Sequence, residues 1–158
     1  MEDIAATLEL NDILLDLEAT DSNALFDAVG RALAHHGLDA ESVARALTAR
    51  ETLGSTGIGM GVAIPHARVE ETTRTHAAFV RLATPIAFGA PDGEPVALFF
   101  LLLAPASADE RHLDLLADFA SLAVDGRLRQ KLMALGDARE VRELIAEGLQ
   151  PSQSLKAA

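Results

Sequence analysis

The sequence predicts an α/β fold, a single domain in which a mixed β-sheet is sandwiched by helices. Three observations lead to this prediction. Helical periodicity comes first along the chain, strand-like apolar segments occupy the middle, and helical periodicity returns at the end. The length of 158 residues fits one core, and hydrophobic residues make up 49% of the chain. We expect the domain to span residues 1–150, with 151–158 as a tail that has little to bury.

The first third of the chain shows two helical patterns. Apolar residues recur at three- and four-residue spacing over 21–36, after the capping candidates Asp21 and Ser22. Gly37 favours an end to this helix, and Gly54 favours an end to a second helix predicted over 39–53. The apolar segment 14–17 is consistent with a short strand before both helices.

Two strands and three helices are predicted in the remainder. Residues 76–82 and 96–103 have strand patterns, and the second is apolar on both faces, which is typical of a central strand. The helical patterns then run over 107–124, 126–134 and 137–147. Helices therefore come before and after a sheet-forming middle.

Composition and charge exclude several classes of function. The chain has no cysteine, which excludes disulfides and thiolate sites. Its longest strongly apolar run, 95–105, is far shorter than the roughly 20 residues of a membrane helix, so we expect no membrane insertion. The acidic start lacks the features of a secretory signal, which predicts a cytoplasmic protein. A net charge of −11 disfavours nucleic acid and favours a basic protein partner.

The segment GSTGIGMGVAIPHA, residues 54–67, is the most unusual part of the sequence. Four glycines and a proline in fourteen residues indicate a close backbone approach rather than a helix. His66 follows Pro65 at the end of an apolar strand-like stretch, and small residues around it leave room for another protein. From the residues alone, a half-exposed histidine at a strand exit is an equally good interpretation.

The other histidines have less distinctive surroundings. His112 lies one turn into a predicted helix, at the edge of its apolar stripe, where a structural role is the commoner one. His35 and His36 come near a helix C-terminus, which predicts surface or capping roles. His76 begins a predicted strand and has a structural role by default.

Histidines without cysteines suit phosphoryl transfer. A neutral imidazole is nucleophilic, and its phosphoramidate can pass a phosphoryl group on. Such chemistry needs donors that neutralise the transferring oxygens, and Arg50, Ser55 and Thr56 are candidates next to the glycine segment. The glycine spacing matches neither a phosphate loop nor a dinucleotide fingerprint, and the histidines match no common zinc spacing. We therefore expect no cofactor and no metal.

The residues also resemble a known family. RETLGSTGIGMGVAIPHA (50–67), TPIAFGAPDGEPV and LLLAPASADERHLDLLADFA resemble the fructose/mannitol-type IIA domains of the bacterial phosphotransferase system. The unbroken GSTGIG followed by IPH resembles most the nitrogen-regulatory branch. The resemblance covers about residues 10–148 and implies an α/β sandwich on a mixed sheet. Ala67 and Met60 depart from the pattern, which often has glycine and a polar residue at these positions.

The resemblance implies roles for individual residues. His66 matches the phosphoryl-accepting histidine, which an HPr-like phosphocarrier protein charges. His112 matches a second histidine that helps to hold the phosphoryl group, Arg50 a nearby arginine, and Ser55–Thr56 the bordering loop. The expected function is a regulatory phosphoprotein whose targets include a kinase, a transporter or a transcription regulator. The alternatives are a sugar-transport IIA protein that relays phosphate to a IIB domain, and a binding module with a vestigial histidine.

Overall fold

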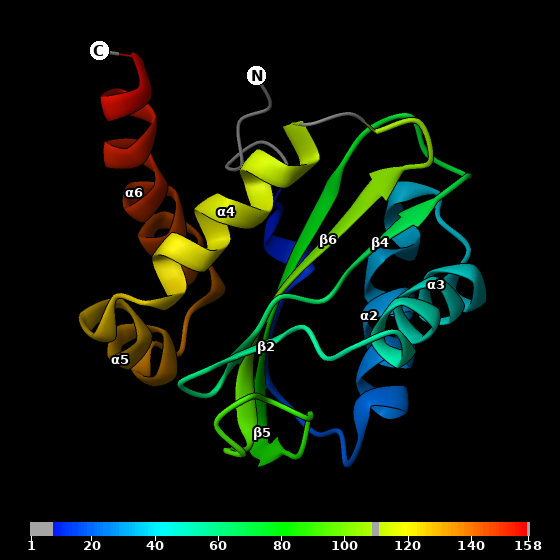
Figure 1. Cartoon of the computed structure of the whole chain (residues 1–158), viewed down its shortest axis with the longest axis horizontal. Helices are drawn as coiled ribbons and strands as arrows, with labels where there is room; N and C mark the ends of the chain where they lie inside the picture. Colours follow the sequence, from blue (N-terminus) through cyan, green and yellow to red (C-terminus); the bar gives the residue numbers. More distant parts are fainter. Residues whose placement is uncertain (1–7, 109–110, 158) are drawn as a thin grey trace.

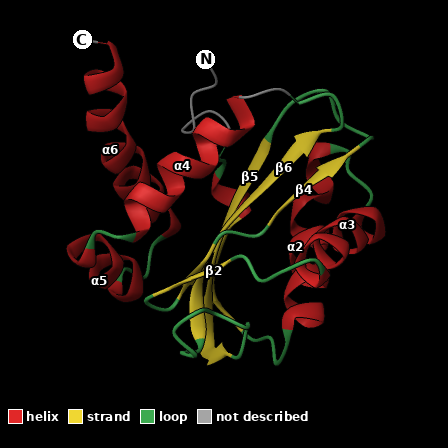
Figure 2. Ribbon diagram, viewed as in Figure 1, coloured by secondary structure: helices red, strands yellow, loops and turns green. Residues whose placement is uncertain are grey.

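The computed structural model describes residues 8–108 and 111–157, with side chains at 8–108 and 114–149. A six-stranded mixed sheet lies at its centre (Figures 1 and 2), in the order β1-β5-β6-β3-β2, with β4 also paired to β6. The strands are β1 (Ile13–Leu17), β2 (Gly57–Gly59), β3 (Val62–Ala63), β4 (His66–Val69), β5 (His76–Ile86) and β6 (Val96–Pro105). The predicted α/β class is confirmed.

Helices cover both faces of this sheet, as the sequence predicts. On one side lie α2 (Ser22–Leu33) and α3 (Ala40–Thr52), and on the other lie α4 (Arg111–Ala123), α5 (Gly126–Ala134) and α6 (Ala138–Ala157) (Figure 1). There are also two short 3₁₀ helices: η1 (Leu10–Asp12) precedes β1, and η2 (Ala34–His36) continues α2. Each face of the sheet therefore has its own apolar core.

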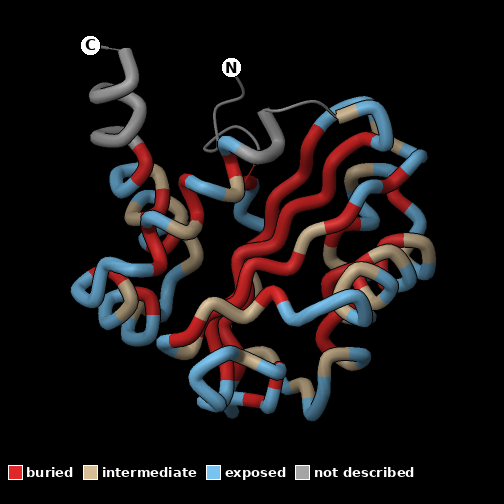
Figure 3. Tube along the Cα trace, in the orientation of Figure 1, coloured by how far each residue is buried: buried red, intermediate tan, exposed pale blue. Residues whose placement is uncertain are grey.

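Strand β6 is buried along its whole length (Figure 3), which confirms the central position predicted from its apolar sequence. It pairs antiparallel with β5, and it pairs parallel with β3 and then with β4. Its side chains alternate between the two cores: Phe99 and Leu101 face α2 and α3, while Leu98 and Phe100 face α4 to α6.

The break between β3 and β4 falls at Ile64 and Pro65. Val62 is opposite Leu98 before the break and His66 is opposite Leu102 after it, an offset of 36 residues in both cases. Proline has no N–H to donate to a ladder, although the Pro65 carbonyl still accepts from the Leu102 N–H at 3.0 Å. The pairing thus pauses without a change of register.

Side-chain caps account for the observed helix starts. Asp21 accepts a hydrogen bond from the Ala24 N–H at 2.8 Å, and Asp39 accepts one from the Ser42 N–H at 3.0 Å. Gly37 ends η2 with a φ of +84°, a left-handed conformation that favours glycine. The predicted bounds of the first two helices agree with the observed ones to within a few residues.

The last helix is longer than predicted. The sequence predicts an end near Glu147 and a tail from Pro151 onward, but α6 continues to Ala157, through most of the expected tail. Gly148 has a packing role. A Cβ at this position would lie 2.4 Å from Cδ2 of Leu122, so glycine lets α6 approach α4 closely. Within the described residues, no helix is both long and apolar enough to cross a bilayer.

Candidate functional site

His66 is the first residue of β4, and its side chain is half-buried. Its Nδ1 atom lies 2.9 Å from the carbonyl oxygen of Ile64. A carbonyl oxygen can only accept a hydrogen bond, so Nδ1 carries the ring proton in this arrangement. In the neutral ring, Nε2 is then the nitrogen with the lone pair.

The pairing of β4 places His66 and its neighbour on opposite faces of the sheet. His66 is in register with Leu102, which belongs to the core under α4 to α6. Ala67 is in register with Leu103 and belongs to the core under α2 and α3. Because strand side chains alternate, Arg68 shares the His66 side of β4.

A cavity of about 510 Å³ opens beside His66. It lies where α3, β4 and α4 meet, because all three contribute to its lining. The described residues that line it are Ala46, Ala49, Arg50, Leu53, His66, Ala67, Arg68 and Leu116. Of the small residues close to His66 in sequence, Ala67 lines the cavity, whereas Gly61 and Ala63 do not.

Two arginines flank this cavity. Arg50, a candidate from the sequence, lies in the last turn of α3 and donates from Nη1 to the Gly54 carbonyl at 2.9 Å. Arg68 was missed by the sequence reasoning, and its Nη1 donates to the Ala106 carbonyl at 3.2 Å. Arg68 could have been predicted from its position two residues after His66, because alternate residues of a strand lie on the same side. A guanidinium has five N–H donors, so a single such bond leaves each arginine capable of binding an anion.

Ser55 and Thr56 do not line the cavity, and their hydroxyls stabilise the glycine segment itself. The Ser55 hydroxyl donates to the Phe88 carbonyl at 2.7 Å. Thr56 is buried, and its hydroxyl donates to Glu51 at 2.7 Å while its N–H donates to the same carboxylate at 2.8 Å. A phosphate-supporting role for these two residues stays a prediction.

The turn of the glycine segment is held by Asp92. Its carboxylate accepts from the Met60 N–H at 2.9 Å and from the Glu94 N–H at 3.1 Å. These two bonds stabilise the charged form and hold the pKa of Asp92 below its ordinary value, with the Met60 N–H the larger cause. Met60 has a φ of +59° and is 44% exposed, so the departure noted in the sequence places an apolar side chain on the surface.

His112 is the second residue of α4, but its side chain lies outside the described residues. Its proposed contact with His66 therefore stays a prediction. The helix that carries it packs over the core on the His66 side of the sheet, where Leu115 and Phe119 belong to the same cluster as Leu102.

The side chains of His36 and His76 are buried. For His36 this contradicts the surface or capping role that the sequence predicts. The His36 side chain is only 3% exposed and contacts carboxylates, so the surface or capping role predicted for it is wrong. The ring of His76 is buried and packs 4.6 Å from that of His36. Topology brings together residues that are far apart in sequence, and helix-end position alone does not predict this.

Comparison with known proteins places the chain in a family. The family model described as "Phosphoenolpyruvate-dependent sugar phosphotransferase system, EIIA 2" matches residues 6–148. Because this match covers most of the chain, the chain belongs to the EIIA type-2 family of the phosphotransferase system.

Its relatives place it in the nitrogen-regulatory branch. The chain is 45% identical over 112 residues to a nitrogen regulatory protein of Klebsiella oxytoca, covering 70% of this chain and 69% of the relative. It is 42% identical over 111 residues to the nitrogen regulatory protein of Escherichia coli K12, covering 70% and 68%. The crystal structure of nitrogen regulatory protein IIA-Ntr from Neisseria meningitidis superposes with a TM-score of 0.86 at 40% identity, covering 90% of this chain and 98% of that one.

Proposed function

We propose that the protein is a histidine phosphoryl carrier that accepts phosphate on Nε2 of His66 and regulates partner proteins according to its phosphorylation state. The observation that carries this proposal is the 2.9 Å hydrogen bond from Nδ1 of His66 to the Ile64 carbonyl. It keeps the proton on one nitrogen and leaves the lone pair on the other, as a nucleophile requires.

The proposed reaction moves one phosphoryl group between two imidazoles. The Nε2 lone pair of His66 attacks the phosphorus of a phosphohistidine on an HPr-like phosphocarrier protein. The new N–P bond forms as the donor's N–P bond breaks, and the bonding electrons return to the donor ring. The Ile64 carbonyl, which accepts from Nδ1–H, stabilises the positive charge that develops on the His66 ring during attack.

Arg50 and Arg68 support this transfer electrostatically. Both line the cavity beside His66 in a chain whose net charge is −11. Phosphoryl transfer depends on positioning and on neutralising the transferring oxygens, and guanidinium groups do both. We assign His112 to the same task, because it belongs to the helix over the His66 side of the sheet.

Regulation follows from the charge that phosphate brings. A phosphoryl group on a side chain adds a charge of about −2 at neutral pH. On His66 it would neutralise the two arginines and change the surface beside Leu53, which is 85% exposed. Partners that dock on this surface, such as a kinase, a transporter or a transcription regulator, would then distinguish the two forms of a cytoplasmic protein.

A second candidate is a sugar-transport IIA component that relays phosphate to a IIB domain. The chain is 34% identical over 109 residues to the fructose-specific EIIA component of Haloferax volcanii, and this likeness favours the candidate. Identities of 42–45% to nitrogen regulatory proteins support the regulatory role more strongly.

The test is phosphorylation by phosphoenolpyruvate with the two upstream carrier proteins, followed by intact mass. We expect one acid-labile phosphoryl group on the wild type, none on His66→Ala, and one on His35→Gln, a control whose histidine lies outside the cavity. If the wild type gains no phosphoryl group, the proposal is wrong and only the binding-module hypothesis remains. Transfer onward to a fructose-type IIB domain, as fast as the charging step, would instead favour sugar transport.

A further inference from the structure

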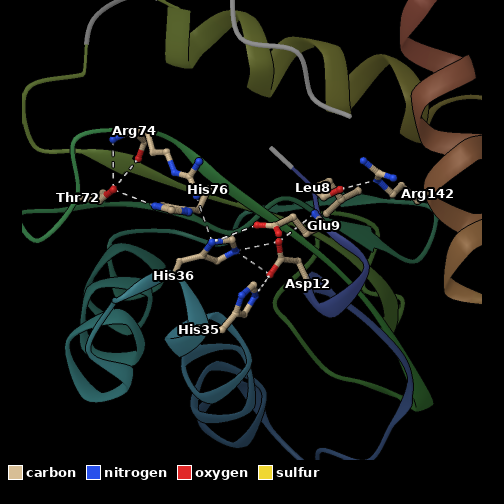
Figure 4. A network of polar contacts seen from close by, with 9 residues as sticks. All are labelled: Leu8, Glu9, Asp12, His35, His36, Thr72, Arg74, His76 and Arg142. Atoms are coloured by element: carbon tan, nitrogen blue, oxygen red, sulfur yellow. Dashed lines mark hydrogen bonds and ion pairs between the residues drawn. The ribbon is translucent and has the colours of Figure 1, made fainter. Parts of the chain in front are cut away.

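A second histidine cluster lies at the start of β5, on the other face of the sheet from the His66 side chain. His35 and His36 end η2, Asp12 ends η1, and Glu9 precedes it (Figure 4). His76 packs its ring against that of His36. These residues play no part in the phosphoryl transfer proposed above.

Two imidazoles converge on one carboxylate oxygen. Nε2 of His35 lies 2.8 Å from Oδ1 of Asp12, and Nε2 of His36 lies 3.0 Å from the same oxygen and 3.0 Å from Oδ2. The Asp12 side chain is fully buried, whereas that of His35 is 33% exposed. The cluster is therefore anchored inside the fold and open to solvent through His35.

The second ring nitrogen of His36 faces another carboxylate. Its Nδ1 lies 3.3 Å from Oε2 of Glu9, whose side chain is 50% exposed. Glu9, His35 and His36 each offer a ligand atom, and these atoms lie within 4.8 Å of one another. A histidine that coordinates a metal through one nitrogen commonly donates its other N–H to a carboxylate in this way.

We propose that this cluster is a binding site for a divalent transition-metal ion, zinc in particular. The ligands are Nε2 of His35, Nε2 of His36 and Oδ1 of Asp12, while Glu9 orients His36 through Nδ1–H. Water from the exposed His35 side completes a tetrahedral set. Imidazole and carboxylate ligands together suit zinc better than magnesium.

The distances agree with this assignment. Zinc–ligand bonds of about 2.0–2.1 Å in a tetrahedron separate neighbouring ligand atoms by roughly 3.4 Å. The two nitrogens lie 2.8 and 3.0 Å from Oδ1, so each must move away from this oxygen by about half an ångström. Binding displaces the protons that hold these hydrogen bonds, and the two carboxylates offset the charge of the ion.

The competing interpretation is a metal-free network of hydrogen bonds. Arg74 favours it, because its Nη2 lies 3.4 Å from Nδ1 of His36 and brings a positive charge to the cluster. Arg74 is exposed, so its guanidinium has room to move into solvent when Glu9 accepts the Nδ1–H. The Asp12 and His36 side chains have less freedom to move, since they are 0% and 3% exposed.

Calorimetry on the chelator-treated full chain, with ZnCl₂ as the titrant and MgCl₂ as the comparison, tests the proposal. We expect one zinc per chain and no magnesium uptake. His35→Gln, whose side chain is partly exposed and so least disruptive to the fold, should abolish saturable uptake. Glu9→Gln should weaken affinity about tenfold, as the loss of an orienting carboxylate does.

Two further measurements keep the result decisive. His66→Ala should bind zinc as the wild type does, so this outcome is independent of the proposed phosphoryl transfer. Visible absorption of bound Co²⁺ should have the intensity of a tetrahedral site in the wild type and lose it in His35→Gln. Zinc uptake that is absent in the wild type, or that is unchanged in a folded His35→Gln variant, overturns the proposal in favour of the metal-free network.

Discussion

Nδ1 of His66 lies 2.9 Å from the carbonyl oxygen of Ile64, only two residues earlier in the chain. This relationship predicts the site of modification within the ring. We expect ¹⁵N chemical shifts of the neutral ring to report the Nδ1–H form and the phosphorylated protein to carry phosphate on Nε2. ¹⁵N and ³¹P NMR measure both. Phosphate on Nδ1 would contradict the assignment, because the Ile64 hydrogen bond would then have to be absent.

Arg50 and Arg68 are predicted to accelerate phosphorylation of His66. Removing one preorganised donor from a reaction site slows the reaction by about a hundredfold to a thousandfold, and these arginines are partly solvated, which favours a smaller effect. We expect Arg50→Ala and Arg68→Ala to slow charging by an HPr-like donor by roughly tenfold each. Initial rates of phosphoryl transfer measure this. Arg45→Ala is the matched control, since Arg45 is an exposed residue of α3 outside the cavity. Equal rates in all three variants would contradict the prediction.

Gly30 is predicted to be required for the contact between α2 and α3. A Cβ at Gly30 would lie 2.4 Å from the backbone oxygen of Ala40, and a backbone atom cannot rotate away as a side chain does. We expect Gly30→Ala to lower the free energy of unfolding by about 1–3 kcal/mol, despite the higher helix propensity of alanine. Denaturant unfolding measures this. In the control, Gly136→Ala, the added Cβ meets no described atom within 4 Å, and stability should change little. A Gly30→Ala variant as stable as that control would refute the close packing.

The turn around Met60 is predicted to depend on pH through Asp92. The pKa of Asp92 is lowered because the Met60 and Glu94 N–H groups donate to the carboxylate. The bond to Met60 is therefore intact at neutral pH, still present at the ordinary pKa of an aspartate, and lost only as the pH falls through the lower folded value. The Met60 amide shift, followed by NMR against pH, should have its midpoint below that of an unfolded aspartate. Asp92→Asn should remove the transition, and a midpoint at or above the ordinary value would contradict the prediction.

Local patterns in the sequence were sufficient for most of the fold. Asp21 and Asp39 cap the helices that periodicity predicts, and the two-sided apolar run of β6 lies at the centre of the sheet. The extent of α6 was missed: Gly148 and Pro151 are poor helix formers, yet both lie within it. Helix propensity is a property of a single residue type, whereas the observed end of a helix also depends on the contacts that its residues make in the fold.

The candidate site was predictable only in part. The sequence singles out His66 and Arg50 as candidates, and the structure shows that both line one cavity. Arg68 could be predicted as a site residue only if one knew that β4 continues past His66. The hydrogen bond from His66 to Ile64 could be predicted only from the backbone path at Pro65. The role of His36 was wrong because its partner, Asp12, lies 24 residues away, and only the packing of η1 against the end of α2 brings them together.

Because the offset of 36 residues is unchanged across Ile64 and Pro65, the proposed chemistry depends on the number of residues between β3 and β4. Side chains alternate along a strand, so one residue inserted or deleted between Ala63 and His66 would turn the imidazole away from α4 and toward α3. Substitutions of Ile64 or Pro65 can change how tightly the segment between β3 and β4 holds the His66 ring, but they do not change its length. Its length determines on which side of the sheet the imidazole lies.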